Sequence, residues 1–227
     1  MRRLAPARSC QMVDDPFVFC CENALPPMFG MHNFYATLTT IPMWFVPLAA
    51  LRDALGQSVD AEVLTWLSVL TTLFLAGTIQ HAVGPESTPP MLNPVPLGIA
   101  QNALLFGCLT RLPRMLSATV AATPVAVAAC WPSWRKIVCD AMDAALSPCV
   151  ILIMGYRSWN DPCAWRLFFR AFLSFVGLVA CTALEPKLCG LPGAEFFHAI
   201  AIHLCISLLF GHVATLALRL LERPKMG

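Results

Sequence analysis

Charged residues are scarce in this chain of 227 residues, in which lysine, arginine, aspartate and glutamate together make up only 12%. A soluble domain carries about 25%, so the composition excludes an ordinary soluble globular protein. The hydrophobic share of 58% indicates a membrane protein instead. The net charge is only +2, and no basic run with interleaved aromatic residues is present, so nucleic acid is not an expected partner.

Paired cysteine motifs are also missing, although the chain has 11 cysteines. Without a CxxC pair a cysteine zinc site is not expected, and the cysteines inside apolar segments are interpreted as small buried side chains. A disulfide that joins Cys20 or Cys21 to Cys189 is one hypothesis for the cysteines near predicted surfaces. No cleavable signal sequence, second domain, linker or internal repeat is expected.

Long apolar runs are what the sequence has in abundance. Seven of them approach the roughly 20 residues that cross a bilayer, and glycine and proline mark the short loops between them. We therefore predict an all-α, polytopic membrane protein with an N-terminal non-membrane segment, residues 1–33, and a seven-helix transmembrane domain, residues 34–227. The predicted helices are 34–51, 61–83, 91–110, 115–133, 137–156, 163–185 and 195–221.

The loop lysines and arginines predict that the N-terminus is outside, because cytoplasmic loops carry the excess of positive charge. This orientation gives the cytoplasmic side Arg52, Arg111, Arg114, Arg157, Arg219, Arg223 and Lys225, and the other side only Arg135, Lys136 and Lys187. The end of the second helix and the start of the seventh then lie at the same depth near the outer leaflet.

Histidines gather in two of the predicted membrane helices, with His81 in the second and His198, His203 and His212 in the seventh. Ionisable residues inside a membrane helix are costly and mark candidate functional sites. A catalytic zinc takes three protein ligands and keeps one position open, so we predict a zinc site of His81, His198 and His203. The alternative is that these histidines make hydrogen bonds between helices. His212 lies far along the helix and is interpreted as a packing residue.

The spacing of His198 and His203 conflicts with a regular helix. Residues five apart are separated by about 140° around an α-helix, which turns His203 away from His198. A π-bulge adds one residue to a turn and is often found at functional sites. If zinc binds, we therefore expect a local widening of the seventh helix between residues 198 and 203.

Asp140 and Asp143, three residues apart, suggest a paired-carboxylate site. They also lie near the start of a predicted helix beside Arg135 and Lys136, where acidic residues are favoured by the helix dipole. We prefer this structural interpretation.

Several short motifs follow one another in an order that resembles one known family. They are Cys21-Glu22-Asn23, the block 33–40, Gly77-Thr78-Ile79-Gln80-His81, Met91-Leu92-Asn93-Pro94, Glu185 with Cys189, and Phe197-His198-Ala199. In this order they resemble the alkaline ceramidases, which are seven-helix membrane hydrolases. The resemblance spans nearly the whole chain.

The resemblance implies hydrolysis of the amide bond of ceramide by a three-histidine zinc, with a calcium site near the N-terminus. By position, His81 and His198 match two zinc ligands, while the third falls on Ile202, one residue before His203. The catalytic serine and aspartate positions fall on Gly77, with Thr78 adjacent, and on Asn93. Of the calcium acids only Glu22 remains, because the others fall on Phe19 and Asn33.

Two functions follow from these observations. One is a ceramidase-like lipid amide hydrolase of the endomembranes, the endoplasmic reticulum or Golgi, with ceramide-like membrane lipids as its partners. The other is a non-catalytic accessory or structural subunit that keeps the fold and a lipid cavity inside a larger membrane complex, for example in an organelle inner membrane. The replaced serine and aspartate favour loss of activity. A transporter is not favoured, because neither repeats nor symmetric broken helices are visible.

Overall fold

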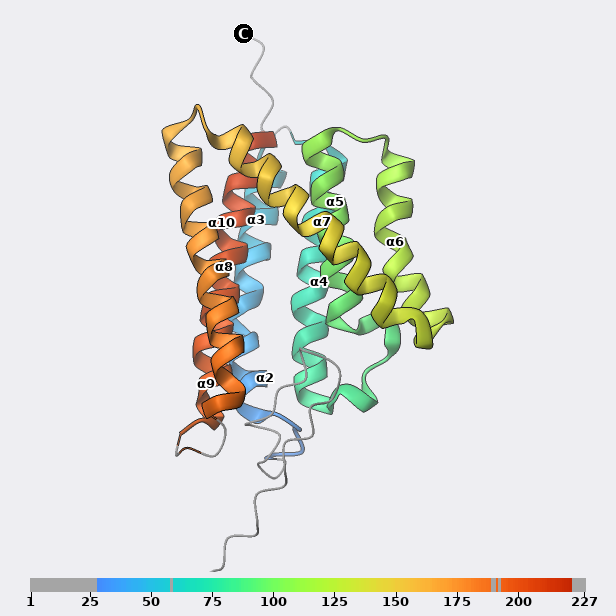
Figure 1. The fold of residues 1–227 in the computed structure, drawn as a ribbon, viewed down its shortest axis with the longest axis vertical. Helices are drawn as coiled ribbons and strands as arrows, with labels where there is room; N and C mark the ends of the chain where they lie inside the picture. The colour runs from blue at the N-terminus through green and yellow to red at the C-terminus, as the bar shows by residue number, and fades with distance from the viewer. Residues whose placement is uncertain (1–27, 58, 189–190, 192, 222–227) are drawn as a thin grey trace, which may run out of the picture.

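Helices make up every regular element in the part of the chain that the structure, a computed structural model, describes: residues 28–57, 59–188, 191 and 193–221. Figure 1 shows a bundle in which most helices share one long axis, while α7 crosses obliquely over the others. The predicted all-α class is confirmed. In order the elements are α2 Phe34–Thr40, η1 Pro42–Trp44, α3 Phe45–Leu55, α4 Ala61–Val83, η2 Pro85–Ser87, η3 Pro90–Leu92, α5 Pro94–Thr110, α6 Arg114–Cys130, η4 Pro132–Trp134, α7 Arg135–Ser158, α8 Pro162–Leu188, α9 Glu195–Phe197, η5 His198–Ile202 and α10 His203–Leu221.

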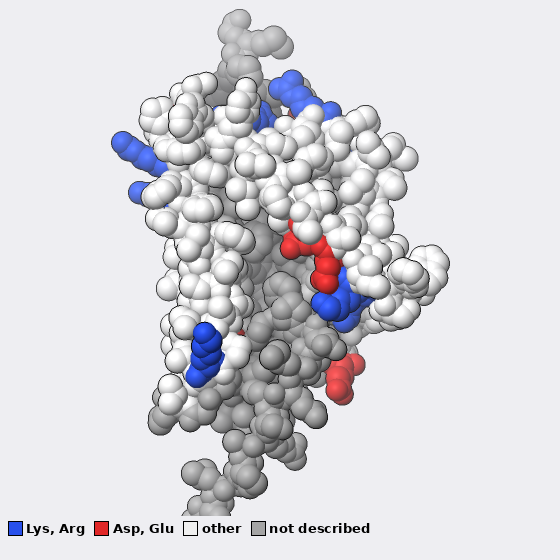
Figure 2. Space-filling view, in the orientation of Figure 1, with Lys and Arg blue, Asp and Glu red and all other residues white. Residues whose placement is uncertain are grey.

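Among the described residues, five helical stretches are long and apolar enough to cross a membrane: Phe34–Leu55, Ala61–Val83, Pro132–Ser158, Pro162–Leu188 and His198–Leu221. The chain is therefore an integral membrane protein. Its surface agrees, because α8 exposes several phenylalanines, such as Phe169 at 51%. On the face drawn in Figure 2, charged side chains form only a few separate groups. Two shorter apolar helices, α5 and α6, have 17 residues each.

The helix bounds differ from the predicted ones mainly at prolines. The first predicted helix, 34–51, continues to Leu55 and is interrupted by the 3-10 turn η1, which begins at Pro42. Proline has no N–H to continue an α-helical ladder, which explains the break. The helix predicted from residue 91 begins at Pro94 instead, because proline suits the first helical position.

A chain of side-chain hydrogen bonds crosses the core between α4, α5 and α7. Trp66 Nε1 donates to Gln101 Oε1 at 2.7 Å, Gln101 Nε2 donates to Asn102 Oδ1 at 2.6 Å, and Asn102 Nδ2 donates to Ser147 Oγ at 3.0 Å. Trp66 is fully buried. Such bonds stabilise helix contacts inside a membrane, and the apolar pattern of these segments gave no sign of them.

The ends of several helices meet at one end of the bundle through arginines. Arg157 donates to the carbonyl oxygens of Leu109, 3.1 Å, and Leu220, 2.9 Å, the C-terminal turns of α5 and α10. Arg219 donates to Asp161 Oδ2 at 2.6 Å, and this hydrogen bond lowers the pKa of the Asp161 carboxyl. The C-terminal turn of α4 and the N-terminal turn of α10 lie at the opposite end of the bundle (Figure 1).

Helices α5 and α6 are in close contact at Gly107. A Cβ atom placed there would lie 2.1 Å from Ser117 Oγ and 2.8 Å from Ser117 Cβ. At Gly98, on the same helix, an added Cβ would have nothing within 4 Å. The contact therefore depends on glycine at 107 but not at 98.

Gly107→Ala is expected to destabilise the protein by about 1–3 kcal/mol, because overpacking forces buried side chains and backbone apart. Gly98→Ala is the matched control and should be neutral or stabilise by up to about 1 kcal/mol, since alanine is the better helix former. Thermal unfolding in detergent measures both, and equal midpoints for the two variants would contradict this account. Adding Ser117→Gly to Gly107→Ala should restore most of the loss.

Candidate metal centre

The C-terminus of α4 positions His81, and the segment before α2 holds this helix end. The backbone N–H groups of His32 and Asn33 donate to the carbonyl oxygens of Ala82 and His81, both at 2.8 Å. They satisfy acceptors that a helix end leaves open. Gly84 ends the helix with φ +87, and a Cβ atom there would lie 3.0 Å from the His32 ring. Glycine is therefore required for this close approach.

A π-helix from His198 to Ile202 joins α9 to α10. Its signature is the N–H of His203, which donates to the carbonyl oxygen of His198, five residues back. The wider turn accommodates one residue more than an α-turn, so His198 and His203 lie on the same side of the helix. The widening predicted from the sequence is confirmed.

The rings of His81, His198 and His203 form a nearly equilateral triangle, here called the three-histidine cluster. Their centroids are 5.5 Å apart for 81 and 198, 5.2 Å for 81 and 203, and 5.0 Å for 198 and 203. One nitrogen from each ring lies within 4.8 Å of the other two. His198 and His203 are buried. His212 is not in this group, which is the only one of its kind among the described residues.

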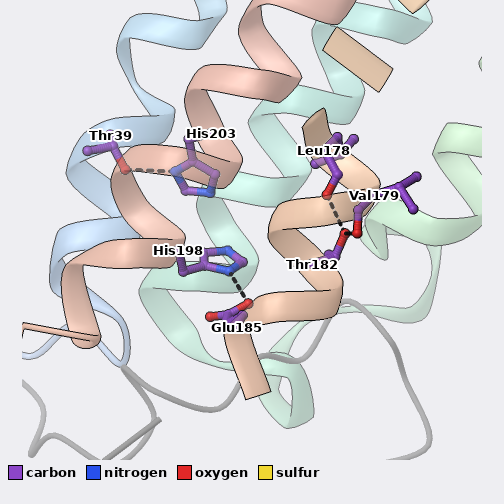
Figure 3. Close-up of polar contacts among 7 residues, drawn as sticks. All are labelled: Thr39, Leu178, Val179, Thr182, Glu185, His198 and His203. Carbon is purple, nitrogen blue, oxygen red and sulfur yellow. Dashed lines mark hydrogen bonds and ion pairs between the residues drawn. The ribbon is translucent and has the colours of Figure 1, made fainter. Parts of the chain in front are cut away.

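Two of the three rings are held at Nδ1 by polar side chains from other helices (Figure 3). His203 Nδ1 lies 2.7 Å from Thr39 Oγ1 on α2, and the Thr39 hydroxyl donates to the Tyr35 carbonyl at 2.9 Å. The threonine oxygen therefore accepts a hydrogen bond from the ring N–H. This tautomer leaves the lone pair of His203 on Nε2.

The second contact is made by Glu185 in the last turn of α8. Its Oε2 lies 3.2 Å from His198 Nδ1. An ionised carboxylate only accepts hydrogen bonds, so the ring donates from Nδ1 and keeps its lone pair on Nε2. Histidines that bind metals almost always donate their other ring N–H to such an acceptor.

The donor set fits zinc. Two nitrogens bound to one tetrahedral zinc lie about 3.3 Å apart, so the cluster nitrogens would close by at most roughly 1.5 Å. Three imidazoles leave the fourth position open for water, which is the arrangement of catalytic zinc sites. The cluster thus has the ligand type and the ligand number of such a site, and two of its three rings have an outer contact at Nδ1.

The two predicted catalytic positions have structural hydrogen bonds. Thr78 Oγ1 accepts from Trp44 Nε1 at 3.0 Å and donates to Thr40 Oγ1 at 2.9 Å, which ties α4 to the first helical stretch. Asn93 is the N-cap of α5 and accepts from the Val95 N–H at 3.0 Å. Asparagine is among the best N-cap residues. These contacts account for a threonine and an asparagine at these two sites.

Part of the predicted calcium site lies outside the described residues, namely Glu22 and Phe19, and so do Cys20, Cys21 and Cys189. The third calcium position, Asn33, is buried, and its Oδ1 lies 3.0 Å from His32 Nδ1. No calcium ligand set can be assembled from Asn33 alone.

The carboxylates of α7 lie beyond its first turn, which has no acidic residue, so contacts along the helix and not the helix dipole account for them. Lys136 forms an ion pair with Asp140 at 3.0 Å across one helical turn, and Ser147 donates to Asp143 at 2.5 Å. Each acid is thus engaged on its own helix.

The two residues that contact the histidine rings, Thr39 and Glu185, were not predicted from the sequence as partners of the cluster. Thr39 belongs to the motif block 33–40, but nothing in that block indicated a contact with His203. Glu185 was noted for its place in the motif order, but the rule that ionisable groups in membrane helices mark function would also have singled it out as a partner of the histidines.

No family model, curated protein or solved structure matches the chain. The three-histidine cluster and its contacts therefore carry the functional argument.

Proposed function

We propose that this chain is a zinc-binding membrane hydrolase that cleaves the amide bond of a ceramide-type lipid. The observation that carries the proposal is the three-histidine cluster, in which His198 and His203 have their Nδ1 atoms held by Glu185 and Thr39. A bound zinc supplies hydroxide near neutral pH and polarises a carbonyl oxygen. The chain contributes three imidazoles, of which His198 and His203 are held at Nδ1 and are buried away from bulk water.

The proposed membrane arrangement is seven spans with the N-terminus outside. Helices α5 and α6, with 17 residues each, fall at the short end of the range of about 17–25 residues for a span. The arginine contacts of α5, α7 and α10 gather at the end assigned to the cytoplasm. Exposed aromatic residues at both ends of the α7 stretch, Trp134 at 58% and Trp159 at 70%, suit the two membrane interfaces.

This arrangement places the three-histidine cluster near the outer boundary of the bilayer. His81 lies in the last turn of α4, less than one helical turn from the helix end. The amide group of a ceramide-type lipid lies where its polar head meets its two chains, so it would reach the same depth. The depth of the site therefore supports a lipid amide as substrate, and endomembranes as the location follow from the resemblance to the ceramidases.

The second candidate function is a non-catalytic subunit of a larger membrane complex that keeps the fold and a lipid cavity. It is favoured by the contacts of Thr78 and Asn93, which serve the packing of α4 and the start of α5. Removing one donor that stabilises the oxyanion costs about 10²–10³-fold in rate, and the serine position of the family falls on Gly77, which has no side chain to donate. The apolar surface of α8 would then face other membrane proteins.

Turnover of ceramide separates the two functions. Purified protein in lipid nanodiscs, with zinc and calcium present, is incubated with ceramides of several chain lengths, and the release of sphingoid base is measured. If the chain is a hydrolase, sphingoid base is released, His81→Ala abolishes this release, and His212→Ala preserves it because His212 lies outside the cluster. Zinc at one per chain with no release, together with co-purifying membrane proteins, would favour the accessory subunit.

A further inference from the structure

Glu185 is the most deeply buried acidic side chain of the described residues, with no exposed surface. It occupies the last turn of α8, just before Pro186. An acid in this setting is costly unless a positive charge or hydrogen bonds compensate it. Its place in the bundle therefore calls for a specific partner.

The partner is the three-histidine cluster. Glu185 Oε2 lies 3.2 Å from His198 Nδ1, and Figure 3 shows the carboxylate and the His198 ring directed toward each other from α8 and the π-helix. Glu185 itself is outside the group of atoms that lie within 4.8 Å of one another. It is thus placed to orient a ligand and not to serve as one.

We propose that Glu185 is a positioning residue of the metal centre, an inference that rests on the proposed zinc site but not on hydrolysis. Its carboxylate accepts the Nδ1–H of His198, fixes the ring plane and keeps the Nε2 lone pair directed at the metal. Its negative charge also offsets part of the charge of a bound dication, which three neutral imidazoles leave uncompensated. Thr39 orients the His203 ring in the same way, but its hydroxyl carries no charge and cannot offset the charge of the metal.

The difference between orientation and charge can be measured. Glu185→Gln keeps the size of the side chain and an oxygen that can accept from Nδ1–H, but removes the charge. Glu185→Leu removes both. Outer-shell changes typically cost about 10–100-fold in metal affinity, so we expect zinc to bind about 10-fold more weakly to the glutamine variant and about 100-fold more weakly to the leucine variant.

The experiment is a competition between the purified full-length protein and a chromophoric chelator for zinc. Glu86→Gln is the matched control, because Glu86 is exposed in η2, and it should bind as the unaltered protein does. Cobalt(II) substitution adds a spectroscopic readout, in which the visible bands of the glutamine variant should shift. If Glu185 had a purely structural role, Glu185→Gln would lower the unfolding temperature of the metal-free protein, and the folded variant would bind zinc as tightly as the unaltered protein.

Two outcomes would overturn the inference, and they differ. If the unaltered protein binds one zinc and Glu185→Gln and Glu185→Leu bind it equally well, the role of Glu185 is refuted while the zinc site stands. If the unaltered protein binds no zinc, both the inference and the proposed function are refuted. Should Glu185→Leu fail to fold, Glu185→Gln alone decides.

Discussion

Replacing His203 by alanine is expected to leave the bundle folded and to remove its zinc. His203 supplies one corner of the triangle, 5.2 Å from His81 and 5.0 Å from His198 between ring centroids, so two imidazoles remain. Because even outer-shell changes cost about 10–100-fold in affinity, loss of a ligand should cost at least about 100-fold. Elemental analysis of purified protein should find close to one zinc per chain before the change and almost none after it.

The control for this prediction lies on the same helix. His212 is on α10 and outside the three-histidine cluster, so the His212→Ala protein should retain its zinc. Circular dichroism of both variants checks that the helices persist. If the His203→Ala protein kept as much zinc as the unaltered protein, the metal would have to bind outside the three-histidine cluster.

The helical class and most helix limits could be predicted because apolar runs and prolines determine them. The second predicted helix, 61–83, and the outer limits of the last, 195–221, coincide with the structure. The interruption at Pro42 was not foreseen, since proline is also tolerated at the start of a helix. Local signals of this kind require no knowledge of neighbouring helices.

The ligands of the candidate site were also accessible from the sequence, because ionisable residues in membrane helices are few. Motif order alone pointed to Ile202, which is buried at 2% exposure, whereas the cluster contains His203. The contacts to the histidine rings were harder to predict from the sequence. Thr39 is one of several threonines in its segment, and its bond to His203 spans 164 residues, so only the packing of α2 against the π-helix creates it.

Deleting Ala201 is the sharpest test of the π-helix. The deletion leaves His198 and His203 four residues apart, the spacing that places two side chains on one face of an α-helix. The extra residue of the π-turn is then gone, and the rest of α10 keeps its orientation. We expect one zinc per chain, bound within about 10-fold of the original affinity, and an unfolding temperature equal to or above that of the unaltered protein, because π-turns are rare.

Inserting one alanine after Ala201 provides the opposite change. It places the two histidines six residues apart, and each added residue rotates a helix by about 100°, so the second ring should leave the cluster and the zinc affinity should fall at least about 100-fold. Zinc titration of the two variants side by side decides the matter. If the deletion variant lost its zinc as fully as the insertion variant, the spacing of the two histidines would not be what the π-helix provides. This result would contradict our account of the π-helix.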